Sequence, residues 1–251
     1  MQWILAFLLV LYTVRGEECT LPDAGGGMLV ASAEDMASCI SSIPFNLTWA
    51  NSTLDVVEKS LDAGFGFRAL YHNTGPPYTI QLDIMGELDA IRQSAIDGAY
   101  ETDFDFQEAI QQVFQYTMDA HTRYSKPVCY NATYFLPFVF NITTVASPEG
   151  TRAAVFLQES ASAVNYTNFN PDAPPVGDYM GQEVVLINGL ESITCISTWA
   201  DNKETRSNNR GIRFNAAVRD FLYRNVQSFN VADMVEEGES QIDLTFADGQ
   251  E

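Results

Sequence analysis

Apolar side chains recur at spacings of three and four along much of the first half of the chain, and this periodicity predicts amphipathic helices. Three such helices are expected, beginning after Asn51-Ser-Thr53, after Asp83, and after Asp103 or Asp105. Gly64 is expected to end the first helix in a left-handed conformation, and Gly98 follows the end of the second. A shorter amphipathic stretch covers residues 33–40. Residues 51–118 are therefore expected to form a small helical subdomain.

The side chains expected to be buried share one face of each helix. On the second helix they are Ile84, Leu88, Ile91 and Ala95. On the third helix, which is expected to run to Met118, they are Phe106, Ile110, Val113, Phe114 and Thr117. Gly86 lies in the first turn of the second helix and is unfavourable there.

The pattern changes near residue 133 to short runs of aromatic and β-branched side chains, which are typical of strands. Strands are expected at 134–140, 153–157, 183–187 and 241–246, and helices at 192–200 and 214–224. Pro137 restricts the first strand to a sheet edge or a bulge, because proline has no N–H to donate. Asn188-Gly189 predicts a tight turn after the third strand. The sequence therefore indicates an α+β fold, with a mainly helical subdomain over 17–132 and a β-rich domain over 133–251.

An apolar run from Trp3 to Tyr12 precedes Thr13-Val-Arg-Gly16. The run has the length of the apolar region of a secretory signal peptide, and it is shorter than the ~20 residues that span a bilayer. We therefore expect residues 1–16 to be a cleaved leader and the product to be secreted, with no membrane anchor. The alternative is that the run forms a buried first strand or helix.

Acceptor triplets for N-linked glycan support the secretory interpretation. Each has the form Asn-x-Thr, and the five acceptors are Asn46, Asn51, Asn131, Asn141 and Asn165. Because a glycan is bulky and hydrated, these side chains are expected to face solvent.

Cysteine usage fits an oxidising compartment. The four cysteines are Cys19, Cys39, Cys129 and Cys195, and all follow the expected cleavage site. An even count indicates two disulfides, and proximity in sequence favours Cys19–Cys39 and Cys129–Cys195 among the three connectivities. A zinc site is disfavoured, since the chain has no Cys-x-x-Cys pair and its histidines, His72 and His121, are far apart. No cofactor is expected.

The formal net charge of −20 repels nucleic acid and anionic membrane surfaces, so neither is expected as a partner. Within this acidic chain, a local basic cluster comprises Arg206, Arg210, Arg213, Arg219 and Arg224. The cluster either grips a carboxylate or phosphate or, as is commoner for surface charges, pairs with acidic side chains.

The segment Asp119-Ala-His121-Thr122 follows the third predicted helix and is the most suggestive candidate for chemistry. A histidine in this position can accept a proton from a nucleophile while a carboxylate orients its other ring nitrogen. The competing interpretation is that Asp119 and His121 only cap the helix and form local hydrogen bonds.

Three features in order resemble the front half of the tail-specific (C-terminal-processing) serine proteases, especially secreted eukaryotic members similar to the chlamydial protease-like factor. They are the segment around His121, the aromatic run through Leu136-Pro-Phe138, and Gly181-Gln-Glu-Val-Val-Leu-Ile-Asn-Gly189. The resemblance covers about residues 80–250. It implies a helical subdomain followed by a PDZ-like domain that holds substrate polypeptide. It also implies that His121 is a general base, as in the branches of the family that use a histidine.

The nucleophilic serine of that family lies in a core that would follow residue 251, and no serine of this chain matches it. The chain alone is therefore expected to lack peptidase activity. It is expected to be either the front half of such an enzyme or a non-catalytic module that adds a peptide strand to a sheet edge. A third alternative is an unrelated secreted α/β glycoprotein.

Overall fold

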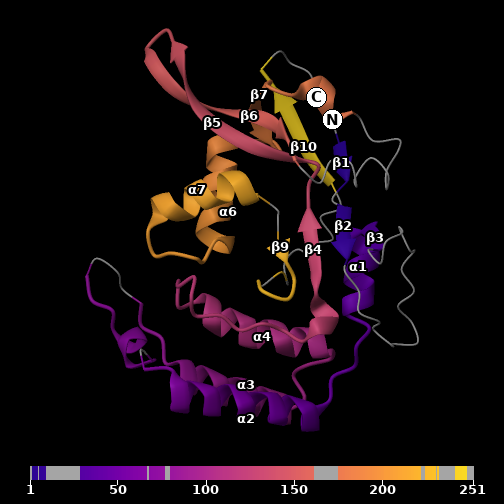
Figure 1. Ribbon diagram of the computed structural model, residues 1–251, viewed down its shortest axis with the longest axis vertical. Coiled ribbons are helices and arrows are strands. Elements are labelled where there is room, and N and C mark those ends of the chain that lie inside the picture. The colour runs from indigo at the N-terminus through magenta and orange to yellow at the C-terminus, as the bar shows by residue number, and fades with distance from the viewer. Residues whose placement is uncertain are drawn as a thin grey trace.

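Three of the predicted helices form a layer at one end of the molecule (Figure 1). They are α2 (Leu47–Gly64), α3 (Ile84–Ile96) and α4 (Asp103–Gln115), whereas α1 (Ala33–Ile40) lies beside the strands. Short 3-10 turns occur at η1 (Arg68–His72), η2 (Val128–Tyr130) and η3 (Val176–Tyr179). The structure is a computed structural model, and it describes residues 2–4, 6–9, 29–66, 68–76, 80–160, 175–221, 224–229, 231 and 241–247.

Side-chain caps fix the starts of α3 and α4. The Asp83 carboxylate accepts a hydrogen bond from the Gly86 N–H at 3.1 Å, as expected for the second predicted helix. At α4, the Thr102 hydroxyl accepts from the Asp105 N–H at 3.1 Å, and the Asp105 carboxylate accepts from the Thr102 N–H at 3.1 Å. This reciprocal pair is a capping box, which satisfies backbone donors that have no partner within the helix.

The start predicted for α2 at residues 51–53 is wrong. Asn46 caps this helix, because its side-chain oxygen accepts from the Trp49 N–H at 3.1 Å, and α2 therefore begins more than a turn earlier. Gly64 is the last helical residue and does not take the left-handed conformation that was expected of it. Gly98 does, with a φ of 77° just past α3.

The faces predicted to be buried on α3 and α4 are buried. They comprise Ile84, Leu88, Ile91, Ala95, Phe106, Ile110, Val113 and Phe114, and Thr117 is buried just beyond the end of α4. Their apolar area supplies the core of the helical layer, which also includes Leu54 and Leu61 of α2.

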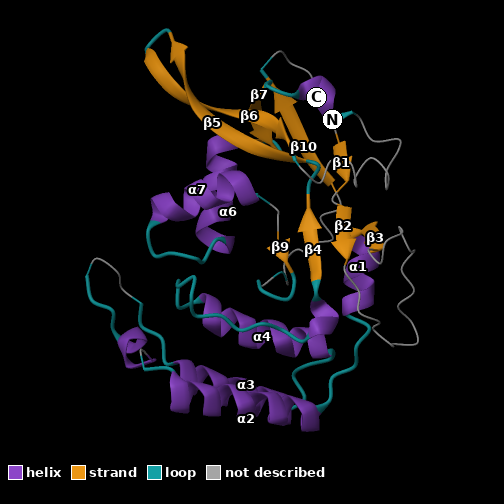
Figure 2. Cartoon of the chain, in the orientation of Figure 1, coloured by secondary structure: helices purple, strands orange, loops and turns teal. Residues whose placement is uncertain are grey.

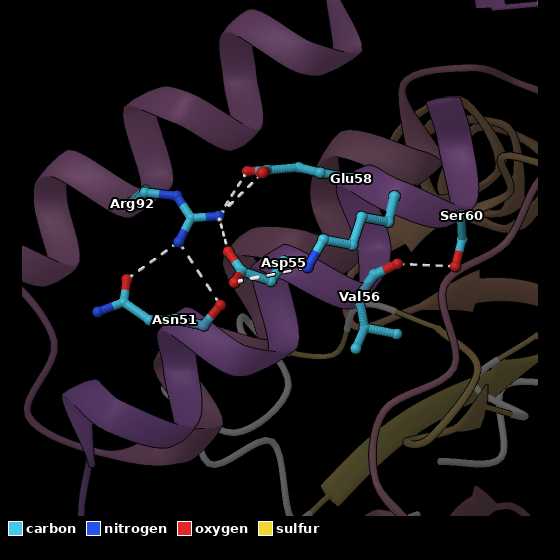
Figure 3. Close-up of polar contacts among 7 residues, drawn as sticks. Asn51, Asp55, Val56, Glu58, Ser60 and Arg92 are labelled. Atoms are coloured by element: carbon cyan, nitrogen blue, oxygen red, sulfur yellow. Dashed lines mark hydrogen bonds and ion pairs between the residues drawn. The ribbon is translucent and has the colours of Figure 1, made fainter. Parts of the chain in front are cut away.

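Arg92 of α3 clamps α3 to α2 through three side chains of α2 (Figure 3). Its guanidinium donates to the Asn51 side-chain oxygen at 3.1 Å, to Asp55 at 3.0 Å and to Glu58 at 2.9 Å. These acceptors lie three and four residues apart, so they share one face of α2. The clamp therefore sets the register between the two helices.

The strands form two sheets (Figure 2). The larger has the order β1-β10-β7-β6-β5, with β8 paired to β7, and its strands are β1 (Gln2–Ile4), β5 (Phe138–Ser147), β6 (Gly150–Glu159), β7 (Glu183–Ile187), β8 (Leu190–Glu191) and β10 (Gln241–Phe246). The smaller has the order β3-β2-β4-β9, with β2 (Ala6–Leu9), β3 (Leu29–Ser32), β4 (Ala132–Phe135) and β9 (Arg224–Asn225). All of the pairings described are antiparallel. The α+β class is confirmed.

The strand predicted over 134–140 is divided at Pro137. Residues before it belong to β4 and the smaller sheet, and residues after it belong to β5 and the larger sheet. Proline cannot donate to a ladder, so the chain changes sheets where its backbone pairing is already interrupted.

The predicted turn at Asn188-Gly189 is present between β7 and β8. Both residues have positive φ, 48° and 74°, which is the conformation that this dipeptide tolerates. The Asn188 side chain also accepts from the Asp243 N–H at 2.8 Å, and this bond ties the turn to β10.

The helices beyond β8 are α6 (Ser192–Lys203) and α7 (Arg210–Asp220). The prediction of a helix at 214–224 is wrong at both ends. Asn209 caps α7 earlier, because its side-chain oxygen accepts from the Gly211 N–H at 2.9 Å and the Ile212 N–H at 3.2 Å.

Two apolar cores lie on either side of α4. Phe106 belongs to the core among α2, α3 and α4, whereas Phe104 belongs to the core formed by strands of both sheets with α1, α6 and α7. α1 therefore packs with the strands, although its residues fall within the range 17–132 that was expected to form a mainly helical subdomain. The helical unit of the structure is α2 to α4.

The predicted Cys129–Cys195 disulfide is absent, since both side chains are thiols. Burial raises the pKa of the Cys129 thiol, which lowers its reactivity. Cys39 is disulfide-bonded on α1, but Cys19, its predicted partner, lies outside the described residues, so that pairing stays a prediction.

The segment expected to be a leader contains two strands, β1 and β2. β1 pairs with β10, and β2 lies between β3 and β4. This pairing agrees with the alternative interpretation, in which the apolar run forms a first strand. Cleavage after Gly16 would remove β2 from the middle of the smaller sheet, so the two interpretations predict different mature sheets.

A buried ion pair joins α4 to the segment that follows β9. Lys126 Nζ lies 2.8 Å from a Glu108 carboxylate oxygen and donates to the carbonyls of Val226 and Phe229, each at 2.7 Å. The other Glu108 oxygen accepts from the Val231 N–H at 3.0 Å. Burial lowers the pKa of Lys126, but the adjacent carboxylate opposes that shift and favours the ammonium form.

Replacing Lys126 by Met should destabilise the protein strongly, because it leaves the Glu108 carboxylate buried without its cation. We expect a loss of about 3–5 kcal/mol in the free energy of unfolding measured in urea. Lys59→Met is the matched control, since the Lys59 side chain is 81% exposed beside Asp55. Equal effects of the two substitutions would contradict this account.

Edman sequencing of protein secreted from eukaryotic cells tests the N-terminal segment. If residues 1–16 are a leader, the secreted chain begins at Glu17, which is the outcome we expect from the apolar run. A secreted chain that begins at Met1 or Gln2 would show instead that β1 and β2 are permanent strands.

Candidate functional site

The turn that carries the predicted catalytic histidine follows α4 after Met118, whose φ is 51°. Asp119 forms an isolated bridge with Ser207. One Asp119 oxygen accepts from the backbone N–H of His121 at 2.9 Å, and His121 Nδ1 lies 3.3 Å from the same oxygen. A carboxylate that binds the N–H two residues further on forms an Asx turn, so His121 is held beside its carboxylate by local geometry.

The second oxygen of Asp119 contacts the helical layer. It accepts from the Tyr71 hydroxyl at 2.9 Å and from the Thr122 hydroxyl at 3.0 Å. Burial acts to raise the pKa of Asp119, but the hydrogen bonds from His121, Tyr71 and Thr122 outweigh it and hold that pKa below its usual value. Burial raises the pKa of Tyr71, and the neighbouring carboxylate adds to this effect.

The His121 ring is 95% exposed, and among the described residues no hydroxyl or thiol is hydrogen-bonded to it. Asp119 can orient the ring, which is what a carboxylate does beside a general base. The geometry therefore fits the interpretation that Asp119 and His121 form local hydrogen bonds. It also supplies the orienting carboxylate, Asp119, that a catalytic role for His121 needs.

The arginine cluster pairs with acidic side chains, as the alternative to an anion site predicted. Arg206 contacts both oxygens of the buried Glu204 at 2.6 Å, and it contacts Asp220 at 2.7 Å. The remaining pairs are Arg219 with Asp220, and Arg210 and Arg213 with Asp201. The Arg224 side chain is not described. These pairings neutralise most of the cluster.

The outer strand of the larger sheet, β5, pairs only with β6 among the described strands. Its ten residues include no charged side chain. One face of β5 is covered, since the Phe140 and Phe221 rings lie 5.4 Å apart and the Trp199 ring of α6 lies 5.3 Å from that of Phe221. α6 and α7 therefore lie against this face of the strand (Figure 1).

The register shows which backbone groups of β5 point outward. Phe140 is opposite Leu157. The Leu157 N–H donates to the Gln182 carbonyl and the Leu157 carbonyl accepts from the Gly181 N–H, and both bonds lie on the side of β6 away from β5. Phe140 and Leu157 are therefore a non-hydrogen-bonded pair, and the pattern alternates along an antiparallel ladder. The residues whose N–H and C=O point to the outer edge thus include Phe140, Ile142, Thr144 and Ala146.

A groove of about 380 Å³ separates α6 from α7. Its apolar lining includes Ile193 and Phe214, and Asp201 and Arg210 lie at its polar side, 2.7 Å apart. Because these two charges already pair, the groove offers mainly apolar surface to a ligand.

The predicted glycan acceptors differ in exposure. Asn46 and Asn141 are exposed, Asn51 and Asn131 are partly exposed, and Asn165 lies outside the described residues. The side-chain oxygens of Asn46, Asn51 and Asn131 accept hydrogen bonds from other residues. A glycan is joined to the amide nitrogen, so these bonds leave the attachment atom available.

Comparison of the chain with protein families, with curated proteins and with solved structures finds no match. Within the described residues, no helix is both long enough and apolar enough to cross a bilayer. The same residues contain no group of three His, Cys, Asp or Glu side chains placed to hold a metal ion.

Asp119→Asn should lower the Tm at neutral pH, and the Tm of the variant should depend less on pH in the acid range. Because the folded-state pKa of Asp119 lies below that of the unfolded chain, its contribution is complete above about pH 4, the usual range for Asp, and is lost as the pH falls through the folded value. The difference in Tm between the two proteins should therefore shrink as the pH falls.

His121→Ala is the control for this measurement. Since the ring is almost fully exposed, its removal should leave Tm nearly unchanged at neutral pH. A pH profile of Asp119→Asn that parallels the parent protein would contradict the role assigned to Asp119.

Proposed function

We propose that the protein is a secreted, non-catalytic module that captures an extended polypeptide by adding it to the outer edge of β5. The observation that carries this proposal is a ten-residue edge strand that has outward N–H and C=O groups and no charged residue. An extended polypeptide presents the same groups at the same repeat, so it can continue the ladder.

The composition of β5 supports this use of its edge. Edge strands that must avoid pairing usually carry Lys, Pro or a bulge. β5 pairs with β6 in unbroken register from Phe138 to Ser147 and has none of these features. Its outer edge is therefore competent to pair with a further strand.

Charge and side-chain packing indicate which peptides are favoured. The net charge of −20 disfavours acidic segments. Phe140 and Ile142 turn toward the helix side of the sheet, so alternate side chains of an added strand would meet the apolar surface near α7. Basic or neutral segments with alternating apolar residues are the preferred ligands.

A second candidate is that the chain acts as the front half of a larger serine peptidase, with His121 as its base. The observation in its favour is the fixed Asp119 carboxylate beside His121 Nδ1. In such an enzyme the nucleophile would come from a core beyond residue 251, and the edge of β5 would hold the substrate. Both candidates therefore give the sheet edge the same task.

Thr144→Pro tests strand addition, because the N–H of this exposed residue points outward and proline removes it without breaking a bond to β6. Twelve-residue peptides selected from a displayed library on the immobilised protein serve as probes, and their Kd is measured by fluorescence polarisation. We expect Thr144→Pro to weaken binding roughly tenfold or more, through the lost bond and the bulk of the ring.

Thr144→Ala keeps the N–H and should bind like the parent. Thr143→Ala should also retain binding, because the backbone groups of residue 143 point into the sheet. Unchanged affinity in Thr144→Pro, at an unchanged Tm, would contradict capture at this edge.

A further inference from the structure

A depression of about 550 Å³ lies on the face of β5 and β6 that is turned away from α6 and α7. Because successive side chains of a strand alternate between faces, Asn141 points opposite to Phe140, which contacts the helix side. The depression is lined by Asn141, Thr143, Phe156, Gln158, Met180 and Gly181, among others. Two residues of one glycan-acceptor triplet, Asn141 and Thr143, thus lie side by side within it.

Phe156 is directly opposite Asn141 across the two strands. The register makes them a hydrogen-bonded pair, in which the two Cα atoms are about 5.5 Å apart and the side chains rise from the same face. Phe156 is only partly buried, so its ring has surface to offer. Asn141 is exposed and makes no side-chain hydrogen bond with a described residue.

We propose that the first sugar of a glycan on Asn141 packs against the Phe156 ring and occupies part of this depression. The bond joins Asn141 Nδ2 to C1 of N-acetylglucosamine. In the transfer, the bond between C1 of the sugar and its polyprenyl diphosphate carrier breaks, and the amide nitrogen loses one proton. A pyranose has one face of C–H groups, and burying that face on an aromatic ring removes apolar surface from water. Among the described acceptors, Asn141 is the one placed opposite an aromatic side chain in a strand pair.

This arrangement is compatible with peptide capture. The glycan rises from the face of the sheet at an odd-numbered residue, whereas the outward backbone groups of β5 belong to even-numbered residues. A hydrated sugar over Phe156 also covers apolar surface on a hairpin whose outer strand, β5, has no charged residue, and this reduces the tendency of the hairpin to stack on another sheet. This inference depends on one part of the proposed function, which is that the protein enters the secretory pathway.

The test is a thermodynamic cycle on the full chain secreted from mammalian cells. Thr143→Ala removes the acceptor triplet while it retains Asn141, and it is made in the parent and in a Phe156→Ala background. We expect mass spectrometry to find Asn141 occupied in the parent. Thr143→Ala should lower Tm by roughly 2–4 °C in the parent and by little in the Phe156→Ala background. Thr143→Ser keeps the triplet and should restore the parent Tm.

Thr48→Ala removes the Asn46 triplet and is the matched control, since its effect on Tm should be the same in both backgrounds. NMR gives a direct readout, because stacking on a ring shifts the protons of the first sugar upfield and Phe156→Ala removes that shift. If Phe156→Ala folds poorly, Phe156→Leu keeps the apolar bulk and should still remove the ring-current shift.

If Thr143→Ala lowers Tm equally in the parent and in the Phe156→Ala background, the proposed packing of the sugar on Phe156 is wrong. An unoccupied Asn141 in a protein that carries glycan on Asn46 would overturn this inference alone. If the chain stays inside the cells and carries no glycan, secretion and this inference both fail. Peptide binding by Thr143→Ala remains a separate measurement, so capture at β5 can fail or hold independently.

Discussion

The buried pair of Glu108 and Lys126 fixes the arrangement of the two apolar cores. α4 lies between those cores. The two side chains of the pair form three hydrogen bonds with backbone atoms of Val226, Phe229 and Val231, and so join α4 to that segment. A charge in this position is expensive to bury without its partner, so any arrangement that separates the two side chains is disfavoured. The helical layer is thereby held in one position against the strands, and the turn after α4 is held with it.

The two candidate sites depend on this arrangement in different ways. Asp119 is fixed by Tyr71 of the helical layer and by its bridge to Ser207, so the turn at His121 lies where the helical layer meets the segment that follows α6. β5 is supported instead by β6 and by the aromatic contacts to α6 and α7. A rigid inner face and an open outer edge are what strand addition needs, because the edge then loses little conformational freedom on binding.

Much of the local structure follows from residue pattern alone. The cap at Asp83 and the turn at Asn188-Gly189 are confirmed, since each depends on contacts within a few residues. The buried faces of α3 and α4 are also confirmed, because the helical period places their apolar side chains on one face. The errors also have local causes. Asn46 competes with residues 51–53 as the start of α2, and Asn209 gives α7 an earlier start than its apolar stripe indicates.

Residue pattern alone specifies the helical faces, the strands at 183–187 and 241–246, the excess of acidic residues and the positions of the glycan acceptors. Tertiary packing sets which strand lies at a sheet edge, and it places Phe156 opposite Asn141 and α1 against the strands. It also leaves Cys129 and Cys195 as thiols. These are relations between segments distant in sequence or between facing positions of a sheet. A residue pattern encodes its own period and caps, but strand order and register depend on the packing of the whole chain.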